Sequence, residues 1–370
     1  MIGDLHTITF ITGQLGLGGA EKQLYLLTEG LLREKWEVSV ITFSPDTNNY
    51  YQEPLRDLGA EIVKIPQNAS RYQRISMISS FLAQKKPQIV HSWGMFTNLY
   101  AAVGGRLAGV PIRLGSERAN ENLSILSMGK VLYNISLLGL NGLVTNSKTA
   151  QNMLSQSHSG LRVFVVPNGI KITQSELILK HESRNLLGIP ENVLVLGGVG
   201  TLEGRKNFKC LIEASSELHK RGFNHFLVIV GDGPLLRDLS QKAANLLPKG
   251  SYKFTGPIPN ASRIYSAFDI FCFTSKALEG MPNVVMEASA AGIPIVANAV
   301  DEVHNLIHHG VTGYIIEPDD EIGRISYISD LLINHDLRDK MGKAALKKIS
   351  EEYSFDDMVS NMANIYQNFL

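Results

Sequence analysis

Two carboxylates, Glu279 and Glu287, flank the start of a predicted helix, and their spacing indicates a binding site. Pro282 lacks an N–H and presets φ, so it suits the first helical turn. Gly292 and Pro294 end the helix just before a buried apolar strand. The helix therefore holds one carboxylate in the loop before it and the other one turn inside.

The helix is expected to begin near Asn283, where unpaired amide groups and the positive end of the dipole attract an anion. The residues that would form this anion seat are Gly280, Met281, Pro282 and Asn283. A carboxylate beside an anion is repulsive, so the pair makes sense where each reaches neutral hydroxyls, as in a sugar nucleotide. The alternative interpretation is an ordinary capped helix with two solvated acids.

The stretch from Glu279 to Glu287 resembles the E-x7-E signature of the retaining glycosyltransferases of family 4. The resemblance extends over essentially the whole chain and is most specific over residues 268–297. It implies that Glu279 binds hydroxyls of the donor sugar and that Glu287 binds the ribose of the nucleotide.

His91 ends a predicted strand, Ile89–His91, where its side chain could face a ligand cleft. A structural histidine with satisfied hydrogen bonds is the alternative. In family 4 the matching histidine contacts the donor sugar near the reacting centre, and the resemblance implies that role for His91 alongside Glu279 as the two catalytic residues.

The glycines Gly18 and Gly19 follow the first predicted strand and open a helix, so their backbone could approach a phosphate. Glu21 stands where a dinucleotide fingerprint needs its last glycine, which weakens a dinucleotide interpretation, although Asp46 after the second strand would suit one. A simple tight turn is the alternative. The loop is similar to the family 4 loop that borders the donor diphosphate, which implies a donor contact through backbone N–H groups.

The adjacent cations Arg205 and Lys206 lie between a predicted strand and a helix, where they could clamp a diphosphate. A solvated charge pair is the alternative. Family 4 enzymes resemble the chain here too. The chain departs from the family pattern at Thr201, where many members have Arg, and at Asn305, where many have Glu.

Hydrophobic residues make up 44% of the 370-residue chain and charged residues 19%, which is typical of a globular protein with more than one core. Cys210 and Cys272 both lie in apolar patterns, which favours buried thiols in a reducing compartment. We therefore expect a cytoplasmic protein, as no basic leader precedes the first apolar run and no stretch is long enough to span a bilayer.

Short apolar runs alternate with helical patterns, which predicts an α/β fold with parallel sheets. The strands of the first half are expected at residues 8–12, 38–43, 62–65, 89–91, 112–115, 142–145 and 163–166. Those of the second half are expected at residues 193–199, 226–230, 252–254, 270–273, 294–297 and 313–316. Two such series indicate two Rossmann-like domains, and ligands of such sheets bind at the carboxyl ends of the strands, in a cleft between facing domains.

The resemblance implies the GT-B architecture, with an acceptor domain over residues 1–170 and a nucleotide-sugar donor domain over 185–350. The polar stretch from Lys171 to Arg184 is interpreted as the connection. Residues 351–370 have a helical pattern, and by analogy with GT-B this helix packs back on the first domain.

A neutral net charge and a pI near 7.2 argue against a nucleic-acid partner. The chain has no Asp-x-Asp or His-Glu-x-x-His motif, so we expect no metal in the site. Residues 124–140 are unusually apolar for a connection; a buried helix is the favoured interpretation, and peripheral docking on an anionic membrane is the alternative. The cations that would assist docking are Arg71, Arg74, Lys85, Lys86, Arg118 and Lys130.

Together with these patterns, the resemblance implies a metal-independent retaining glycosyltransferase of hexosyltransferase type that needs no cofactor besides its nucleotide-diphosphate sugar. The acceptor is expected to be a saccharide or a lipid-linked molecule, in polysaccharide or glycolipid biosynthesis. The alternatives are a non-catalytic subunit that binds sugar nucleotides and an epimerase of the GT-B type.

Overall fold

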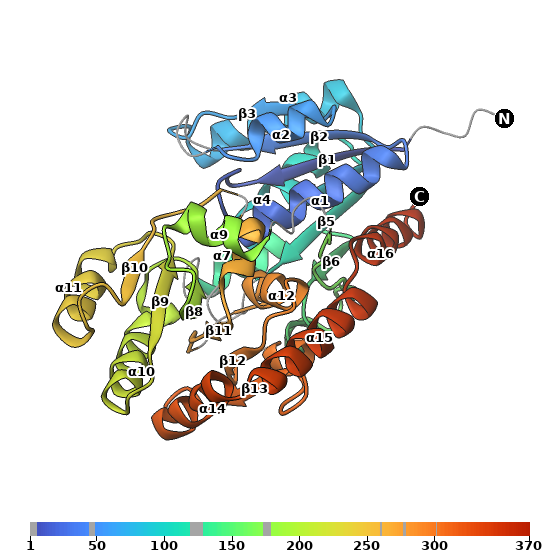
Figure 1. Ribbon diagram of the computed structural model, residues 1–370. Coiled ribbons are helices and arrows are strands. Elements are labelled where there is room, and N and C mark those ends of the chain that lie inside the picture. Colours follow the sequence, from blue (N-terminus) through green and yellow to red (C-terminus); the bar gives the residue numbers. More distant parts are fainter. Residues whose placement is uncertain are drawn as a thin grey trace. The chain divides into compact units, whose positions relative to one another are not determined.

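The computed structural model describes residues 6–43, 49–118, 129–172, 179–259, 261–276, 279–300 and 302–370. The chain divides into two compact units. The first consists of Met1–Gly169 together with Phe355–Leu370, and the second of Ile170–Ser354. Each unit has its own parallel sheet with helices packed on it (Figure 1). The expected α/β class with two Rossmann-like sheets is therefore confirmed.

The first sheet has seven parallel strands in the order β3-β2-β1-β4-β5-β6-β7. They are β1 Thr7–Thr12, β2 Glu37–Thr42, β3 Glu61–Lys64, β4 Ile89–Ser92, β5 Ile112–Glu117, β6 Gly142–Thr145 and β7 Val163–Val165. All seven were expected from the sequence, because buried parallel strands are short, nearly continuous apolar runs. The strand order reverses between β1 and β4, and this is the point at which open sheets of this kind bind ligands.

The helices of the first unit are α1 Gly19–Arg33, α2 Gln52–Asp57, α3 Arg71–Lys85, α4 Met95–Leu99, η1 Tyr100–Gly104, α5 Gly105–Leu107, α7 Lys130–Leu137, α8 Lys148–Ser157 and α16 Phe355–Gln367. Ser70 caps α3 in a capping box with Gln73. The last helix, α16, belongs to this unit and packs on α1, as Figure 1 shows with α16 in red. The helices α1 and α16 lie so close together that a Cβ on Gly30 of α1 would be 2.2 Å from a methyl carbon of Val359 in α16.

The second sheet has six parallel strands in the order β10-β9-β8-β11-β12-β13. They are β8 Leu194–Val199, β9 His225–Val230, β10 Tyr252–Phe254, β11 Ile270–Phe273, β12 Ile295–Asn298 and β13 Gly313–Ile316. Successive residues of β8 point into two different hydrophobic clusters, Val195 into one and Leu196 into the other. Both faces of this sheet are therefore covered, and its order reverses between β8 and β11.

The helices of the second unit are α9 Lys180–Leu187, η2 Gly204–Lys206, α10 Phe208–Lys220, α11 Leu236–Leu246, η3 Ala261–Ala267, α12 Asn283–Ala290, α13 Val303–Leu306, α14 Glu321–Ile333 and α15 His335–Glu352. The end of α12 touches α15, since a Cβ on Gly342 would lie 1.9 Å from the carbonyl oxygen of Gly292. This close approach packs the candidate helix α12 against the rest of the second unit.

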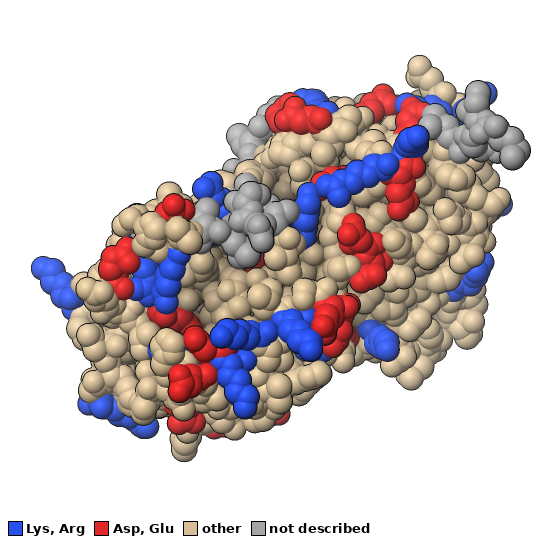
Figure 2. Space-filling model, turned by 45° about the vertical axis from the view of Figure 1, so that its right-hand side comes forward, with Lys and Arg blue, Asp and Glu red and all other residues tan. Residues whose placement is uncertain are grey.

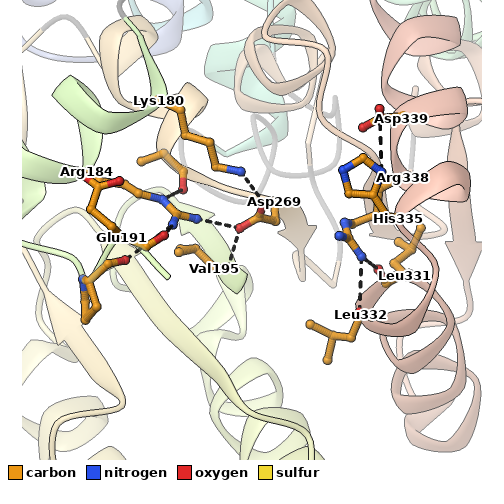
Figure 3. Close-up of polar contacts among 12 residues, drawn as sticks. Lys180, Arg184, Glu191, Val195, Asp269, Leu331, Leu332, His335, Arg338 and Asp339 are labelled. Atoms are coloured by element: carbon orange, nitrogen blue, oxygen red, sulfur yellow. Dashed lines mark hydrogen bonds and ion pairs between the residues drawn. The ribbon is translucent and has the colours of Figure 1, made fainter. Parts of the chain in front are cut away.

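The connection was expected to run from Lys171 to Arg184. Its carboxyl-terminal bound is wrong, because α9 already begins at Lys180. Arg184 is buried and its guanidinium binds the Asp269 carboxylate at 2.8 Å, as Figure 3 shows. This ion pair makes α9 part of the second unit. Residues 173–178 of the expected connection lie outside the described residues.

The apolar stretch from residue 124 forms helix α7 from Lys130 onward, and residues 119–128 lie outside the described part. Tyr133 and Leu137 are buried against a small hydrophobic cluster, whereas Val131 is 75% and Leu138 69% exposed. The helix is thus half buried. Within the described residues, no helix is long and apolar enough to cross a bilayer.

Candidate functional site

The carboxylate of Glu279 lies among two cations and a hydroxyl at the carboxyl end of β11. Its Oε1 accepts hydrogen bonds from Ser275 Oγ at 2.6 Å, Lys206 Nζ at 2.6 Å and Arg205 Nη1 at 2.8 Å. The Glu279 side chain is only 10% exposed. Three of the residues singled out in the sequence are thereby brought together in the second unit.

The fold joins these residues because β8 and β11 are neighbouring parallel strands whose carboxyl ends share one edge of the sheet. The turn η2 that carries both cations is tied to the end of β11 by three hydrogen bonds. Thr274 Oγ1 donates to the carbonyl of Lys206 at 2.8 Å. Ser275 Oγ and the Lys276 amide both donate to the carbonyl of Arg205, at 3.2 Å and 2.9 Å. The positions of Arg205 and Lys206 are therefore set by the strand that leads to Glu279.

Helix α12 begins at Asn283, as the sequence predicted, with Pro282 as the residue that precedes its first turn. Met281 is buried, whereas Gly280 and Asn283 are partly exposed. A helix start presents backbone N–H groups and partial positive charge, so this turn has the polarity that an anion needs. Ala277 and Leu278, just before it, lie outside the described residues.

Glu287 lies one turn inside α12, where its Oε2 accepts a hydrogen bond of 2.8 Å from the hydroxyl of Tyr265. Tyr265 belongs to η3 and is fully buried. Burial, and after it the Glu287 carboxylate, raises the pKa of Tyr265 well above its ordinary value, so the phenol stays protonated and donates. The sequence analysis missed Tyr265, because a contact across 22 positions leaves no periodic signal.

His91 is completely buried at the end of β4 in the first unit. Its Nδ1 lies 2.7 Å from the Tyr366 hydroxyl oxygen and its Nε2 lies 3.0 Å from Ser116 Oγ. Burial, and after it the charge of Arg118, lowers the pKa of His91 to about 3, so its ring is neutral at ordinary pH. These contacts are those of the structural histidine that the sequence left as an alternative.

Gly18 and Gly19 stand at the start of α1, with Gly18 immediately before the helix. The Glu21 side chain folds back over them, so that a Cβ on Gly18 would lie 2.0 Å from Glu21 Oε2. Gln14 Nε2 donates to the other Glu21 oxygen at 2.8 Å. A side chain at position 18 would have to displace this carboxylate, which is the end of a flexible side chain. Asp46 lies outside the described residues.

Arg118 directly follows β5 in the first unit, and the sequence analysis considered it only as part of a scattered basic surface. Its guanidinium carbon lies 3.5 Å from the centre of the Trp93 ring, and its Nη1 donates to Asn168 Oδ1 at 3.2 Å. Burial lowers the pKa of Arg118 to about 9, which leaves it a cation at neutral pH. Trp93 is itself held by a hydrogen bond of 2.7 Å to the carbonyl of Ala20.

The two departures from the family pattern lie at different places in the second unit. Thr201 is exposed just after β8. Asn305 in α13 donates to Glu302 Oε2 at 2.5 Å, and Glu302 is buried. Asp301, which precedes Glu302, lies outside the described residues.

A cavity of about 770 Å³ lies at the other edge of the second sheet, beside Asp269 and the start of β8. Figure 3 shows that Lys180 and Arg184 both contact Asp269 there, while Arg338 donates to carbonyls of α14. These charges satisfy one another or the backbone. The cavity also lies at the amino ends of the strands, away from Glu279, so we leave it out of the candidate site.

Charged side chains of both signs are mixed on the face that Figure 2 draws, and its described part has no broad stripe of Lys and Arg. Within the described residues, no group of three or more His, Cys, Asp and Glu side chains could hold a metal ion.

Comparison with known protein families adds an independent observation. The family model described as "Glycosyl transferases group 1" matches residues 180–348, and the model described as "Glycosyltransferase Family 4" matches residues 17–174. The putative glycosyltransferase EpsF of Bacillus subtilis (strain 168) is 26% identical over 314 residues, which are 80% of this chain and 80% of EpsF.

The UDP-Gal:alpha-D-GlcNAc-diphosphoundecaprenol alpha-1,3-galactosyltransferase of Escherichia coli is 26% identical over 261 residues, which are 66% of this chain and 67% of that enzyme. Among solved structures, the Anabaena protein HepE in complex with UDP and glucose has a TM-score of 0.84 at 19% identity, over 98% of this chain and 100% of that one. The structural likeness shows that the two chains share a fold.

Proposed function

Because the chain belongs to the glycosyltransferases of group 1 and family 4, which have the GT-B fold, we propose that it moves a sugar from a nucleotide-diphosphate sugar to an acceptor hydroxyl with retention of anomeric configuration. The observation that carries this proposal is the cluster of Arg205, Lys206 and Glu279 beside the start of α12. The cluster combines positive charge for phosphates with a carboxylate for sugar hydroxyls.

The second unit is proposed to bind the donor. Arg205 and Lys206 neutralise the diphosphate, and the backbone of Gly280 to Asn283 meets its distal phosphate or the sugar. Glu287, which Tyr265 holds in place, accepts hydrogen bonds from the ribose. Glu279 accepts hydrogen bonds from the sugar hydroxyls. The first unit is proposed to supply the acceptor side, with Gly18 and Gly19 bordering the diphosphate.

Catalysis is proposed to rest on stabilising the charge that develops on the departing diphosphate. Two cations and a helix start supply preorganised positive charge in a partly buried place, so we propose that no metal ion and no further cofactor are needed. Retention of configuration follows if the acceptor attacks the sugar from the same face as that from which the leaving group departs, as is proposed for the family. The anomeric proton signals of the product in NMR test this directly.

His91 is proposed to contact the donor sugar as a neutral hydrogen-bonding group. Its low pKa supports the neutral form and argues against a role as a protonated acid. Because both ring nitrogens already have partners, Ser116 Oγ would have to release Nε2 for such a contact.

The acceptor is proposed to be a saccharide or a lipid-linked saccharide in polysaccharide or glycolipid synthesis. The name of the Escherichia coli relative describes transfer to a diphosphoundecaprenol-linked sugar, which supports this class. A peripheral contact of the protein with anionic lipid is part of the proposal, supported by two exposed apolar residues, Val131 in α7 and Leu138 just after it. The supporting charge is smaller than the sequence suggested, since Lys85 pairs with Glu37 and Glu61.

A thermal-shift screen with UDP, GDP, ADP and their sugar forms tests the donor site. A ligand at about 100 times its Kd stabilises by roughly 2.7 kcal/mol, which is a few degrees of Tm. We expect one nucleotide to stabilise the protein selectively and Glu287→Ala to lose the shift. Glu182→Ala, an exposed acid on another helix of the same unit, is the matched control and should keep it.

Absence of a shift with every nucleotide would contradict the proposal. Binding of a nucleotide sugar without any turnover, in the presence of candidate acceptors, would favour the non-catalytic subunit instead. Turnover of the donor sugar without an acceptor alcohol would favour an epimerase.

A further inference from the structure

A buried chain of hydrogen bonds lies behind Glu279 in the second unit. Arg324 of α14 donates from Nη2 to Asn298 Oδ1 at 2.9 Å. The Nδ2 of Asn298, at the end of β12, donates to the carbonyls of Thr274 and Ser275 at 2.8 Å and 3.1 Å. Arg324 is 2% exposed and Asn298 is not exposed at all.

The far end of this chain reaches the candidate site. Ser275 Oγ donates to Glu279 Oε1 at 2.6 Å, and Thr274 Oγ1 donates to the carbonyl of Lys206 at 2.8 Å. Asn298 therefore holds the carbonyls of the two residues whose side chains fix the carboxylate and the turn with the cations. A shift of Asn298 would move both sides of the cluster together.

The direction in which Arg324 bonds decides how the Asn298 amide lies. A guanidinium only donates, so it selects the amide orientation that presents Oδ1 to Arg324. The same orientation turns the Nδ2 group toward the two carbonyls. The flipped amide would set donor against donor at Arg324 and acceptor against acceptor at Thr274 and Ser275, so Arg324 excludes it.

Burying the Arg324 side chain in the core costs free energy. A buried cation loses its hydration, and its Nε is buried without a hydrogen-bond partner. An apolar side chain of similar length would avoid both losses. The apolar side chain would not supply the hydrogen bond that orients Asn298, nor the one that Arg324 donates to the Pro318 carbonyl at 2.8 Å.

We propose that Arg324 and Asn298 are positioning residues that set the geometry of Glu279, Arg205 and Lys206 for the donor sugar, an inference that rests on the proposed function of this site. Neither residue touches the donor. Both act through the end of β11.

The first experiment measures amide hydrogen exchange of the protein alone at Lys276, whose N–H donates to the Arg205 carbonyl at 2.9 Å. Asn298→Asp keeps the acceptor for Arg324 but loses both donated bonds, and Arg324→Met replaces the cation by an apolar side chain. We expect both to speed exchange at Lys276 about tenfold, and Arg324→Met also to lower the Tm, because Asn298 Oδ1 and the Pro318 carbonyl lose their donor. The control is Arg184→Lys, at an equally buried arginine on the other edge of the sheet, which should leave Lys276 unchanged.

Unchanged exchange at Lys276 in Asn298→Asp would overturn the proposal, and this variant decides the matter if Arg324→Met does not fold. Equal acceleration in Arg184→Lys would overturn it as well, because the effect would then be a general loosening of the unit.

The second experiment uses UDP and UDP-glucose as binding probes. Because Asn298 holds both the turn that carries Arg205 and Lys206 and the residue that bonds Glu279, Asn298→Asp should raise the Kd of both probes, that of UDP-glucose about tenfold and that of UDP by less. An unchanged Kd for both probes would contradict positioning of this cluster by Asn298. Failure of the wild-type protein to bind any nucleotide would count against the proposed function, whereas the exchange experiment would still decide the inference.

Discussion

The hydroxyl oxygen of Tyr366 lies 2.7 Å from Nδ1 of His91, which joins the last helix of the chain to the end of β4. Both residues are fully buried, and burial raises the pKa of Tyr366 well above its ordinary value. The neutral phenol and the neutral imidazole thus form a hydrogen bond inside the first unit. The last helix of the chain, α16, therefore supplies a hydrogen-bond partner to His91, a candidate site residue.

The first prediction concerns the pH dependence that His91 gives to stability. Its pKa is about 3 when folded and near its ordinary 6.5 when unfolded. The unfolded chain therefore binds more protons between these values, so the free energy of unfolding falls as pH drops from about 6.5 toward 3, by up to about 1.4 kcal/mol per pH unit. His91→Asn should be less stable at pH 7 but show a shallower decline, measured by urea unfolding between pH 7 and 4.

The exposed His335 supplies a control, and His335→Asn should keep the wild-type slope. A His91→Asn slope that equals the wild-type slope would show that this imidazole is not held neutral by burial.

The second prediction tests the contact between α1 and α16. Gly30→Ala would place a methyl 2.2 Å from a Val359 methyl carbon, so we expect it to destabilise the first unit by about 1–3 kcal/mol. Val359→Ala removes the obstructing methyls, and the double variant should be less destabilised than the sum of the two single ones. Strict additivity in thermal unfolding would argue against this contact.

The third prediction separates the roles of the groups around Glu279. Glu279→Ala should lower kcat for transfer by about 100-fold or more, because a group that orients the reacting sugar is lost. Nucleotide affinity should fall far less, since Arg205 and Lys206 remain to bind the diphosphate. Ser275→Ala removes one of the three bonds to Glu279 and should cost only about three- to tenfold in kcat.

The measurement pairs steady-state transfer with calorimetric binding of the nucleotide alone. Equal losses of transfer and nucleotide binding in Glu279→Ala would contradict the assignment of this carboxylate to the sugar.

The fourth prediction concerns the two cysteines, which are free and buried. Burial raises the pKa of Cys272 to about 12 and also raises that of Cys210. Because the thiolate is the reactive form, both thiols of the folded protein should react with a disulfide reagent at pH 8 at least on the order of 100-fold more slowly than in denaturant. Rapid reaction of either thiol in the native protein, followed by absorbance, would refute this.

Local sequence by itself was sufficient for the strands and for the start of α12. Each strand is a short apolar run bounded by turn residues, and these signals depend only on neighbours in the chain. Pro282, Gly292 and the carboxylates Glu279 and Glu287 likewise fall within one short segment, so their arrangement around the helix start could be predicted. Neighbouring parallel strands then brought Arg205 and Lys206 to the same edge, as the α/β pattern indicated.

The tertiary structure alone decided which partners these residues have. The sequence placed His91 at the end of a strand, but it could not show that its ring bonds Tyr366 and Ser116, which stand 275 and 25 positions away. Tyr265 on Glu287, and Arg324 behind Asn298, are contacts of the same kind. Hydrogen bonds between distant segments depend on how the helices pack on the sheet, and packing leaves no periodic trace in the sequence.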